Sequence, residues 1–589
     1  MIIVLQVKCA CNVCSFVLNN FFVYTSGGIG TSKSTKRPVS SKGVWERDST
    51  MNKKIMGHAL NRRAFLKWNA AMGAGLCAGG PFQRAMAMET RTRRFHASLS
   101  IQALEENPEL LPTVVRAGID AVWVAAFLQG AWHYPPEKVT EWKQRIEAAG
   151  VEMHHITVPL GHPSFTEAAP DYMQGASYLS WQAGMRPDGA RYHGVCVHPP
   201  AAEVNAEAVA KLYAAAPGII FLDDDFRLAP SPHDIGGCFC DKHRAAFLQK
   251  HGYTDAQWDE LIDAVNRRAL TPLLRAWLED ACDELTACFR AQQQVLPAGA
   301  LGIMVMYFGS EKAGIRLTDY ADAPMRVGEF MFSDDVFKPV KGKTDELFSA
   351  LFHRRFVSPD NAYSETTAWP PDGLSAANLS AKFAVSTIAD VRNTMLMSGI
   401  TPYPLAYWDT LGPAMKAHAP MHERLAGHVP RGPFKHYWGE HSRWAGDSNP
   451  FSLFFATGVP FEVTETLAPD GYTFLSDADA RAMSEGALKP QGGVSVCRDS
   501  ANLKMEGARP VAESLEALFA FKHEILPQLR ETPYVVEDLP VVCAWYPTAG
   551  LAALWNLSEK PQRFTVTHKG QNHTAETGPL GMALVEGLG

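Results

Sequence analysis

From about residue 95 onwards, short runs of apolar, β-branched or aromatic residues alternate with longer segments of helical periodicity. This alternation is typical of βα units, whose parallel strands are buried on both faces. Eight such strands with intervening helices favour a closed (β/α)8 barrel, the TIM barrel, over an open doubly wound sheet. The predicted strands are 95–101, 121–127, 152–158, 219–223, 301–307, 329–332, 362–365 and 404–408.

Two helical segments are clear in this region. Segment 136–150 begins with Pro-Glu, carries Val139, Trp142 and Ile146 at helical spacing, and stops at Gly150. Segment 255–296 predicts a long helical stretch after the fourth strand. Because no glycine-rich phosphate loop follows any predicted strand, the sequence does not support dinucleotide binding.

The pattern changes after about residue 440, where short apolar segments are separated by turn-rich loops. We expect a barrel over 88–440, a small α/β domain over 441–530 and a C-terminal β-domain over 531–589. The strands predicted for the α/β domain are 451–455, 461–464, 472–475 and 494–496, with a helix over 477–486. Those predicted for the β-domain are 551–557, 563–567 and 582–585.

The N-terminal segment 51–87 is typical of a twin-arginine (Tat) export signal. Arg62 and Arg63 lead into a weakly apolar, small-residue run, and Ala85 and Ala87 offer the small residues that a signal peptidase needs. We therefore expect the Tat translocon to export the chain to the periplasm or beyond, with a mature protein from about Met88.

Residues 1–50 predict no membrane anchor. Their apolar part is broken by lysine and asparagine, which makes a poor membrane span. We interpret 1–50 as the product of a mis-called start codon, with Met51 as the true start. If 1–50 are translated, the Tat motif lies too deep in the chain and export becomes doubtful.

Composition narrows the possible partners. The chain has 589 residues, a formal charge of −7 and 46% hydrophobic residues, with an isoelectric point near 6.3. No global basic field would attract nucleic acid or anionic lipid, so neutral or weakly charged ligands fit better. Seven cysteines follow the leader, and this odd, scattered set predicts no disulfide framework.

Two sets of carboxylates end predicted strands, at the edge where a barrel carries its active site. Strand four ends in Asp223, Asp224 and Asp225, and like charges this close raise at least one pKa, as a general acid requires. Glu365 ends strand seven. Two carboxylates on opposite faces of a sugar are the groups that glycoside cleavage uses. The alternatives are an Asp-rich loop that caps a helix or binds Ca²⁺, and a surface Glu in a turn.

The segments 222–226 and 237–243, with Phe247, resemble glycoside hydrolase family 42 β-galactosidases and their less characterised clan-A relatives. In that family a strand-four Asp-Asn-Glu motif is followed by Cys-x-Cys-x-x-Cys. The resemblance implies that Asp225 is the acid/base, that Asp224 replaces the Asn, and that Glu365 is the nucleophile. It also implies a trimerisation domain around 451–496 and hence a possible homotrimer.

The chain departs from the family pattern at two positions, because Asp225 is one methylene shorter than Glu and Asp224 replaces Asn. Asp224 and Asp225 both stay candidates for the acid. The resemblance favours retention, although a shorter acid could widen the gap to Glu365 and admit the water that inversion requires. We expect a β-galactosidase-like or related exo-glycosidase that needs no catalytic cofactor. The alternative is a non-catalytic carbohydrate-binding or scaffold protein.

A metal centre is a further expectation. Cys238, Cys240 and His243 place three soft ligands within one helical turn and its lead-in loop. The resemblance adds Cys196 ahead of strand four, and a Cys₃His set would close a structural Zn²⁺ site. The alternative is that the metal was lost and that small buried thiols remain.

Further substrate-binding candidates surround these carboxylates. Asp223 and Asp224 would tune Asp225 and hold hydroxyl groups, and Arg227 would orient the acids or bind a hydroxyl or carboxylate. We expect Tyr307 to follow strand five, and Trp408 and Asp409 to follow strand eight. The resemblance implies that Trp408 forms the floor of the −1 sugar subsite. Asp334 and Asp335 are expected to end strand six.

Overall fold

A computed structural model describes residues 92–589 of the chain, except 129–130, 158–182, 224–225, 232, 306–307, 309, 330, 502, 504–506 and 530. All elements below belong to the unit Glu89–Gly589. The predicted extension 1–50 and Tat signal 51–87 lie outside the described residues. Within the described ranges, no helix combines the length and the apolar character that a bilayer crossing needs.

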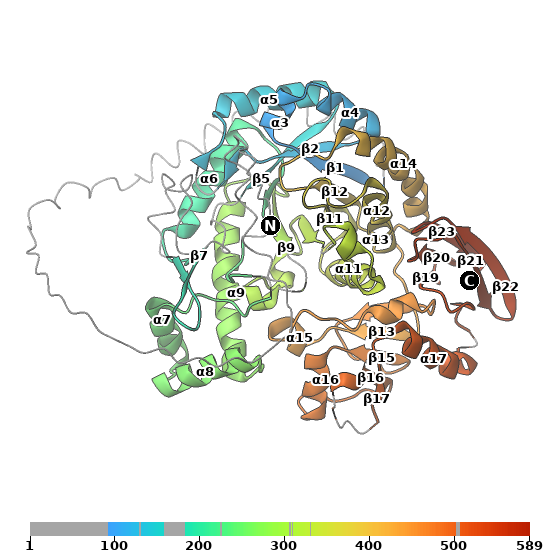
Figure 1. The fold of residues 1–589 in the computed structure, drawn as a ribbon. Helices are drawn as coiled ribbons and strands as arrows, with labels where there is room; N and C mark the ends of the chain where they lie inside the picture. Colours follow the sequence, from blue (N-terminus) through green and yellow to red (C-terminus); the bar gives the residue numbers. More distant parts are fainter. Residues whose placement is uncertain are drawn as a thin grey trace, which may run out of the picture. The chain divides into compact units, whose positions relative to one another are not determined.

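Eight parallel strands form a closed barrel in the order β1-β12-β11-β10-β9-β8-β5-β2, which confirms the predicted fold class (Figure 1). Strands one to eight along the chain are β1 (Arg94–Ser98), β2 (Ala121–Val124), β5 (Glu152–Thr157), β8 (Ile220–Leu222), β9 (Leu301–Val305), β10 (Met325–Gly328), β11 (Ala362–Thr367) and β12 (Asn393–Met397). Two short hairpins, β3–β4 (Phe127–Leu128, Ala131–Trp132) and β6–β7 (Ala183–Met185, Arg191–Val195), lie outside the barrel.

Large side chains fill the barrel. Trp123, Phe221, Tyr363 and Met395 form one buried cluster from four different strands, and the Trp123 and Phe221 ring centroids are 4.7 Å apart. Gly302 faces this cluster, and a Cβ there would lie 2.4 Å from the Phe221 ring. The interior is therefore packed, and functional groups are confined to its ends.

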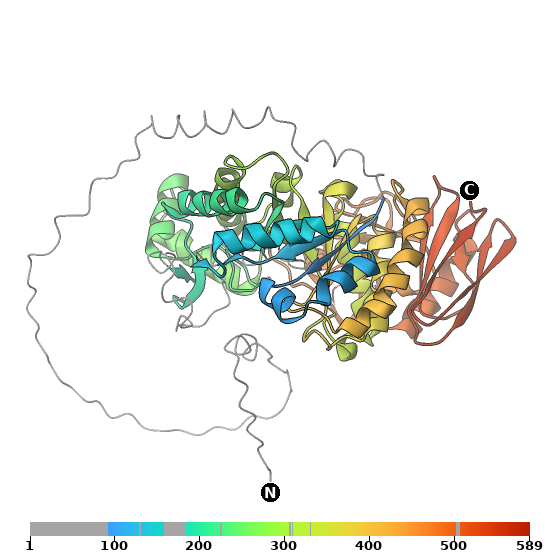
Figure 2. The same ribbon diagram turned by 90° about the horizontal axis from the view of Figure 1, so that it is seen from above.

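Helices cover the outer face of the barrel (Figure 1 and Figure 2). The helices of this region are α3 (Ile101–Glu106), α4 (Leu110–Ala117), α5 (Pro136–Ala148), α6 (Ala201–Ala215), α7 (Asp241–His251), α8 (Asp255–Arg267), α9 (Pro272–Gln293), α10 (Asp334–Phe337), α11 (Val340–His353), α12 (Ala376–Ala381), α13 (Phe383–Ile388) and α14 (Trp408–Leu425). Of these, α7 and α8 pack beside α9 in a separate apolar cluster. The predicted helix 136–150 is confirmed as α5. The predicted stretch 255–296 is two helices, because Arg268 adopts a left-handed φ of 51° and Pro272 starts a new helix.

Two predicted strands are wrong. The sixth strand is Met325–Gly328 and not 329–332, and the eighth is Asn393–Met397 and not 404–408. Segment 404–408 instead contains the 3-10 helix Leu405–Tyr407 and the first residue of α14. Both true strands carry polar residues, Arg326 and Asn393, and these interrupt the apolar run by which a buried strand is recognised.

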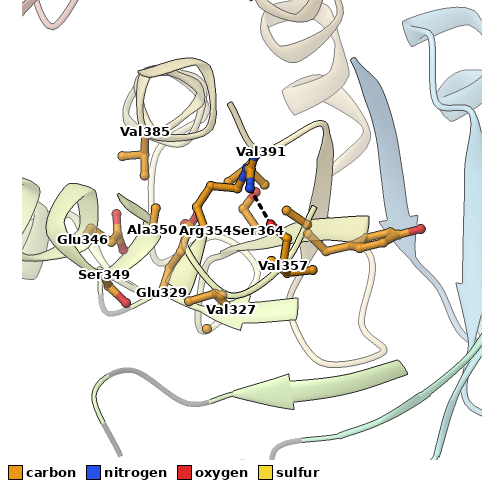
Figure 3. A pocket seen from close by; sticks show the side chains of 13 residues that line it. Val327, Glu329, Glu346, Ser349, Ala350, Arg354, Val357, Ser364, Val385 and Val391 are labelled. Carbon is orange, nitrogen blue, oxygen red and sulfur yellow. Dashed lines mark hydrogen bonds between the residues drawn. The ribbon is translucent and has the colours of Figure 1, made fainter. Parts of the chain in front are cut away.

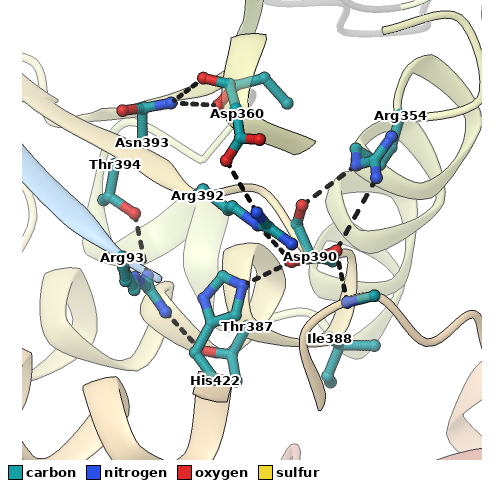
Figure 4. A network of polar contacts seen from close by, with 12 residues as sticks. Arg93, Arg354, Asp360, Thr387, Ile388, Asp390, Arg392, Asn393, Thr394 and His422 are labelled. Carbon is teal, nitrogen blue, oxygen red and sulfur yellow. Dashed lines mark hydrogen bonds and ion pairs between the residues drawn. The ribbon is translucent and has the colours of Figure 1, made fainter. Parts of the chain in front are cut away.

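A polar network fixes the start of the eighth strand (Figure 4). Asp390, in a left-handed turn with φ of 51°, accepts hydrogen bonds from His422 Nε2 at 2.9 Å and from the Gly427 backbone at 3.0 Å. Asn393 Nδ2 donates to the Asp360 carbonyl at 2.9 Å. The polar residues that hide this strand in the sequence are thus the ones that anchor it.

The region after the barrel contains a five-stranded parallel sheet in the order β14-β13-β15-β16-β17. Its strands are β13 (Phe434–Tyr437), β14 (Phe461–Thr464), β15 (Tyr472–Leu475), β16 (Val494–Arg498) and β17 (Arg509–Val511), with helices α15 (Glu440–Trp444), α16 (Asp477–Ser484) and α17 (Leu515–Ile525). The predicted α/β character is confirmed. The predicted strand 451–455 is wrong, because Leu453–Ala456 is a 3-10 helix.

Antiparallel strands end the chain in two three-stranded sheets, β18-β21-β22 and β19-β20-β23. The strands are β18 (Tyr534–Val535), β19 (Val541–Tyr546), β20 (Leu551–Asn556), β21 (Gln562–His568), β22 (Gln571–Thr577) and β23 (Met582–Glu586). The predicted C-terminal β-structure is confirmed.

Candidate functional site

Two acids from opposite parts of the sequence lie at the carboxyl edge of the barrel. Asp223 directly follows β8, the fourth strand, and Glu365 belongs to β11, the seventh. Glu365 pairs in register with Gly328 and Met395, and because Tyr363 two residues earlier fills the barrel, Glu365 also faces inward. The Asp223 side chain is 26% exposed and that of Glu365 is 11% exposed.

One guanidinium group connects the two acids. Arg326, in β10, is fully buried and forms an ion pair through Nη2 with Asp223 Oδ1. Its Nε lies 3.6 Å from Glu365 Oε2. The acids of strands four and seven therefore both lie within reach of a single side chain from strand six.

A hydroxyl group from the same strand orients Glu365. The Thr367 hydroxyl donates to Glu365 Oε1 at 3.0 Å. Nearby, the Tyr403 hydroxyl donates to the Thr366 carbonyl at 3.0 Å and to the Met397 carbonyl at 2.5 Å. Burial, and then the negative charges of Glu329 and Glu365, raise the pKa of Tyr403 well above its ordinary value. Tyr403 therefore stays neutral and serves as a fixed donor beside the site.

The remaining residues predicted around strands four and five do not join Asp223 and Glu365 in the described structure. Asp224, Asp225 and Tyr307 lie outside the described residues. Arg227 is buried, and its Nε donates to the Ala229 carbonyl at 3.3 Å. The structure thus brings Asp223 and Glu365 together and holds Arg227 within its own loop.

Trp408 and Asp409 do not follow a barrel strand. They begin helix α14, because the eighth strand ends eleven residues before Trp408, at Met397. Trp408 is 3% exposed and packs in the main apolar core. The placement at the end of strand eight, on which their assignment depended, is wrong.

The acid that follows strand six is Glu329, since Asp334 and Asp335 begin helix α10. Glu329 is 4% exposed and lies 2.7 Å from Lys382 Nζ, which also lies 3.3 Å from Glu346. A cavity of about 10 Å³ between β10, β11 and helices α11 and α13 is lined by both glutamates (Figure 3). Burial raises the pKa of Glu329 to about 8. The sequence gives no sign of this cluster, because the pattern of 329–332 predicts a strand.

The predicted metal ligands do come together. The ligand atoms of Cys196, Cys238, Cys240 and His243 all lie within 4.8 Å of one another, and the four residues are buried. Cys196 and Cys240 Sγ are 3.8 Å apart, about the edge of a tetrahedron with Zn–S bonds of about 2.3 Å. Cys196 and Cys238 Sγ, at 2.6 Å, would have to separate by about 1 Å to reach that edge. The donor set fits Zn²⁺.

The charges around these ligands also suit a metal. A hydrogen bond from the Cys196 thiol, together with the neighbouring His243, lowers the pKa of Cys238 to about 4, and a thiolate is the form that binds metal. His243 directs Nδ1 towards Cys240 at 3.3 Å and Nε2 towards Glu284 at 3.0 Å. A carboxylate behind a ligating histidine fixes the ring in the orientation that the metal needs. A cavity of about 120 Å³, lined by Cys238, His243 and Glu284 among others, adjoins the cluster.

Comparisons with known proteins identify solved structures of similar fold, but they do not assign the chain to a family. No family model matches the chain, and no curated protein sequence matches it. The β-galactosidase from Rahnella sp. R3 matches with a TM-score of 0.55 at 12% identity, over 84% of this chain and 98% of that one. The β-galactosidase from Marinomonas ef1 matches with a TM-score of 0.55 at 11% identity, over 83% and 99%.

A third solved structure, the β-galactosidase from Bacillus circulans sp. alkalophilus, gives a TM-score of 0.52 at 10% identity, over 84% of this chain and 98% of that one. Each match spans nearly the whole of the known enzyme, so the likeness includes the domains that follow the barrel. The chain therefore has the fold of these β-galactosidases, a closed (β/α)8 barrel followed by additional sheets.

Proposed function

We propose that the protein is a glycoside hydrolase that uses a pair of carboxylates from strands four and seven. One observation carries the proposal: Asp223 and Glu365 lie at the carboxyl edge of the barrel, both in contact with Arg326. In TIM-barrel enzymes this edge holds the active site. The shared fold with β-galactosidases supports the same conclusion, and the substrate class is a carbohydrate.

In the proposed mechanism, Glu365 attacks the anomeric carbon while Asp225 protonates the departing oxygen. The bond from Glu365 to the sugar forms as the glycosidic bond breaks, and a water then cleaves this intermediate with Asp225 as the base. Two displacements retain the anomeric configuration. Asp223 and Asp224 bind sugar hydroxyls and tune Asp225, and Tyr307 lines the subsite.

The proposed substrate is a β-galactoside or a related sugar released from a chain end. The three matched structures are β-galactosidases, and the strand-four triple Asp is the feature expected to alter the preferred sugar. By the same resemblance, the assembly is proposed to be a homotrimer. Export through the Tat translocon to the periplasm is part of the proposal and rests on Arg62 and Arg63.

A structural Zn²⁺ is also proposed, held by Cys196, Cys238, Cys240 and His243. Four protein ligands leave no open position on the metal, so it would join the β6–β7 region to helix α7 and take no part in the reaction. This position suits a chain that folds before export, since a cytosolic metal would lock the loop after strand four.

The test is hydrolysis of a panel of aryl glycosides by the chain from Met88. Glu365→Gln is expected to lower turnover on the order of 10³-fold or more, because the attacking oxygen is lost. Asp225→Asn should cost less with substrates whose leaving groups need no proton. Asp335→Asn, at an exposed acid on α10, is the matched control and should be silent. A folded wild type that turns over no glycoside contradicts the proposal and favours the carbohydrate-binding alternative.

A further inference from the structure

Arg326 is a charged side chain in surroundings that are otherwise apolar. It is fully buried. Its Nη1 lies 3.6 and 3.4 Å from the sulfur atoms of Met395 and Met397, and its guanidinium carbon lies 5.6 Å from the Phe221 ring centroid. A guanidinium in such a place is costly unless anions compensate it, and among the described residues it forms ion pairs with Asp223 and Glu365.

The two contacts differ in kind. The ion pair with Asp223 includes a direct hydrogen bond from Nη2, whereas Nε and Glu365 Oε2 are 3.6 Å apart, longer than a hydrogen bond. Asp223 is therefore the partner that Arg326 holds by a hydrogen bond. Glu365 can move away from Arg326 without the loss of a hydrogen bond between the two side chains.

This difference between the two contacts suits the change of charge that occurs when Glu365 attacks the anomeric carbon. The three groups carry a net charge of −1 when both acids are ionised. When Glu365 forms its bond to the anomeric carbon, its negative charge is consumed and the Arg326–Asp223 pair that stays behind is neutral. The charge of Arg326 is then still compensated by Asp223 in the intermediate.

We propose that Arg326 is a positioning residue that sets the strand-seven nucleophile Glu365 against the strand-four acid Asp223 and balances their charge through the reaction. The inference rests on the proposed function, since it takes Glu365 to be the nucleophile. Arg326 reaches no substrate, because its side chain has no exposed surface. It acts through the two carboxylates.

The groups around Glu365 define what a pH profile would report. Arg326 contacts it from β10 and also pairs with Asp223, which follows β8. Tyr403 lies near it in the segment after β12, and Glu329 accepts a hydrogen bond from the neighbouring Thr366. Without Arg326, Glu365 loses its cation while the anion Asp223 stays nearby. Without Asp223, the guanidinium of Arg326 has Glu365 as its remaining ion-pair partner among the described residues. The first change makes ionisation of Glu365 less favourable, and the second makes it more favourable.

The test compares Arg326→Met and Asp223→Asn with the wild type in pH–rate profiles of kcat and kcat/KM on the best aryl glycoside. Methionine is unbranched and suits the surrounding thioethers. We expect the acidic limb to move to higher pH by about one unit or more in Arg326→Met, and to lower pH in Asp223→Asn. Arg326→Lys, a point charge that cannot contact both acids, should fall between Arg326→Met and the wild type. Acidic limbs that stay in place, or that move in the same direction, would overturn the inference.

A second measurement does not depend on turnover. Melting temperatures of Arg326→Met, Glu365→Gln and the double variant form a double-mutant cycle. The sum of the decreases in melting temperature of the two single variants should exceed the decrease of the double variant, because the double variant removes both partners of the contact together. Additive losses would overturn the contact between Arg326 and Glu365 even if no glycoside were cleaved. A wild type without turnover but with a non-additive cycle would instead contradict the proposed function alone.

Discussion

The buried acid Glu329 should make the stability of the protein fall as pH rises, and one substitution should remove this dependence. Burial raises the pKa of Glu329 from 4.5 to about 8, so the folded chain binds this proton more tightly than the unfolded chain does. The stabilisation is fully present below about pH 4.5 and is lost as the pH rises through about 8. At neutral pH the Lys382 ammonium then pairs mainly with Glu346, 3.3 Å away.

The size of the effect follows from the shift. Each pH unit is worth about 1.4 kcal/mol, so the full contribution is at most roughly 5 kcal/mol, and relaxation around Lys382 reduces it to about 2–4 kcal/mol. Glu329→Gln keeps the shape of the side chain and cannot ionise. Its free energy of unfolding should match that of the wild type near pH 5 and exceed it by about 2–4 kcal/mol near pH 9.

Urea unfolding of both proteins at pH 5, 7 and 9 measures this difference, and other titrating groups cancel in the comparison. Glu346→Gln is the control. It removes the partner that balances Lys382 while Glu329 is protonated, so it should destabilise the protein by about 3 kcal/mol at pH 5 and 7 and by less at pH 9, where the ionised Glu329 pairs with Lys382. A difference between Glu329→Gln and the wild type that does not change with pH would refute the reasoning.

Three further predictions concern other parts of the chain. The purified protein should carry about one zinc ion per chain, and Cys238→Ser should lose it and melt at a lower temperature; metal analysis that finds no zinc in the wild type argues against the site. Arg443→Met should destabilise the protein by about 3 kcal/mol, because it leaves the Glu311 carboxylate, whose side chain is 1% exposed, without its ion-pair partner; an unchanged unfolding midpoint would contradict this. Replacing Arg62 and Arg63 by lysine should retain the protein in the cytoplasm, as cell fractionation would show, and unimpaired export would exclude the Tat assignment.

The sequence predicts the barrel where its strands are continuous and apolar. Segments such as 121–127 and 301–307 are recognisable because both faces of a parallel strand are buried. It fails at the sixth and eighth strands, where Arg326 and Asn393 point to partners in the barrel that are far away in the sequence. Helical and strand patterns report local burial and contain no information about such distant partners.

Some residues of the candidate site could likewise be predicted from the sequence, and others could not. Glu365 and Asp223 could be found because carboxylates at the ends of apolar strands are unusual and have a known meaning in a barrel. Arg326 could have been noticed as a charge flanked by Met325 and Val327, the alternation of a strand with one polar inward position. The Glu329 pairing with Lys382, by contrast, joins two loops that are separated by 53 residues, and only the fold brings them together.

The most direct test of the central claim is to identify the carboxyl group that bonds to the sugar. The protein is incubated with activated 2-deoxy-2-fluoro glycosides of the sugars that it cleaves, and the labelled peptide is mapped by mass spectrometry. The account predicts about one label per chain, on Glu365, and no label in Glu365→Gln. A label on Asp223, Asp224 or Asp225 would contradict it, as would turnover of these sugars with no trapped intermediate and with inversion at the anomeric carbon.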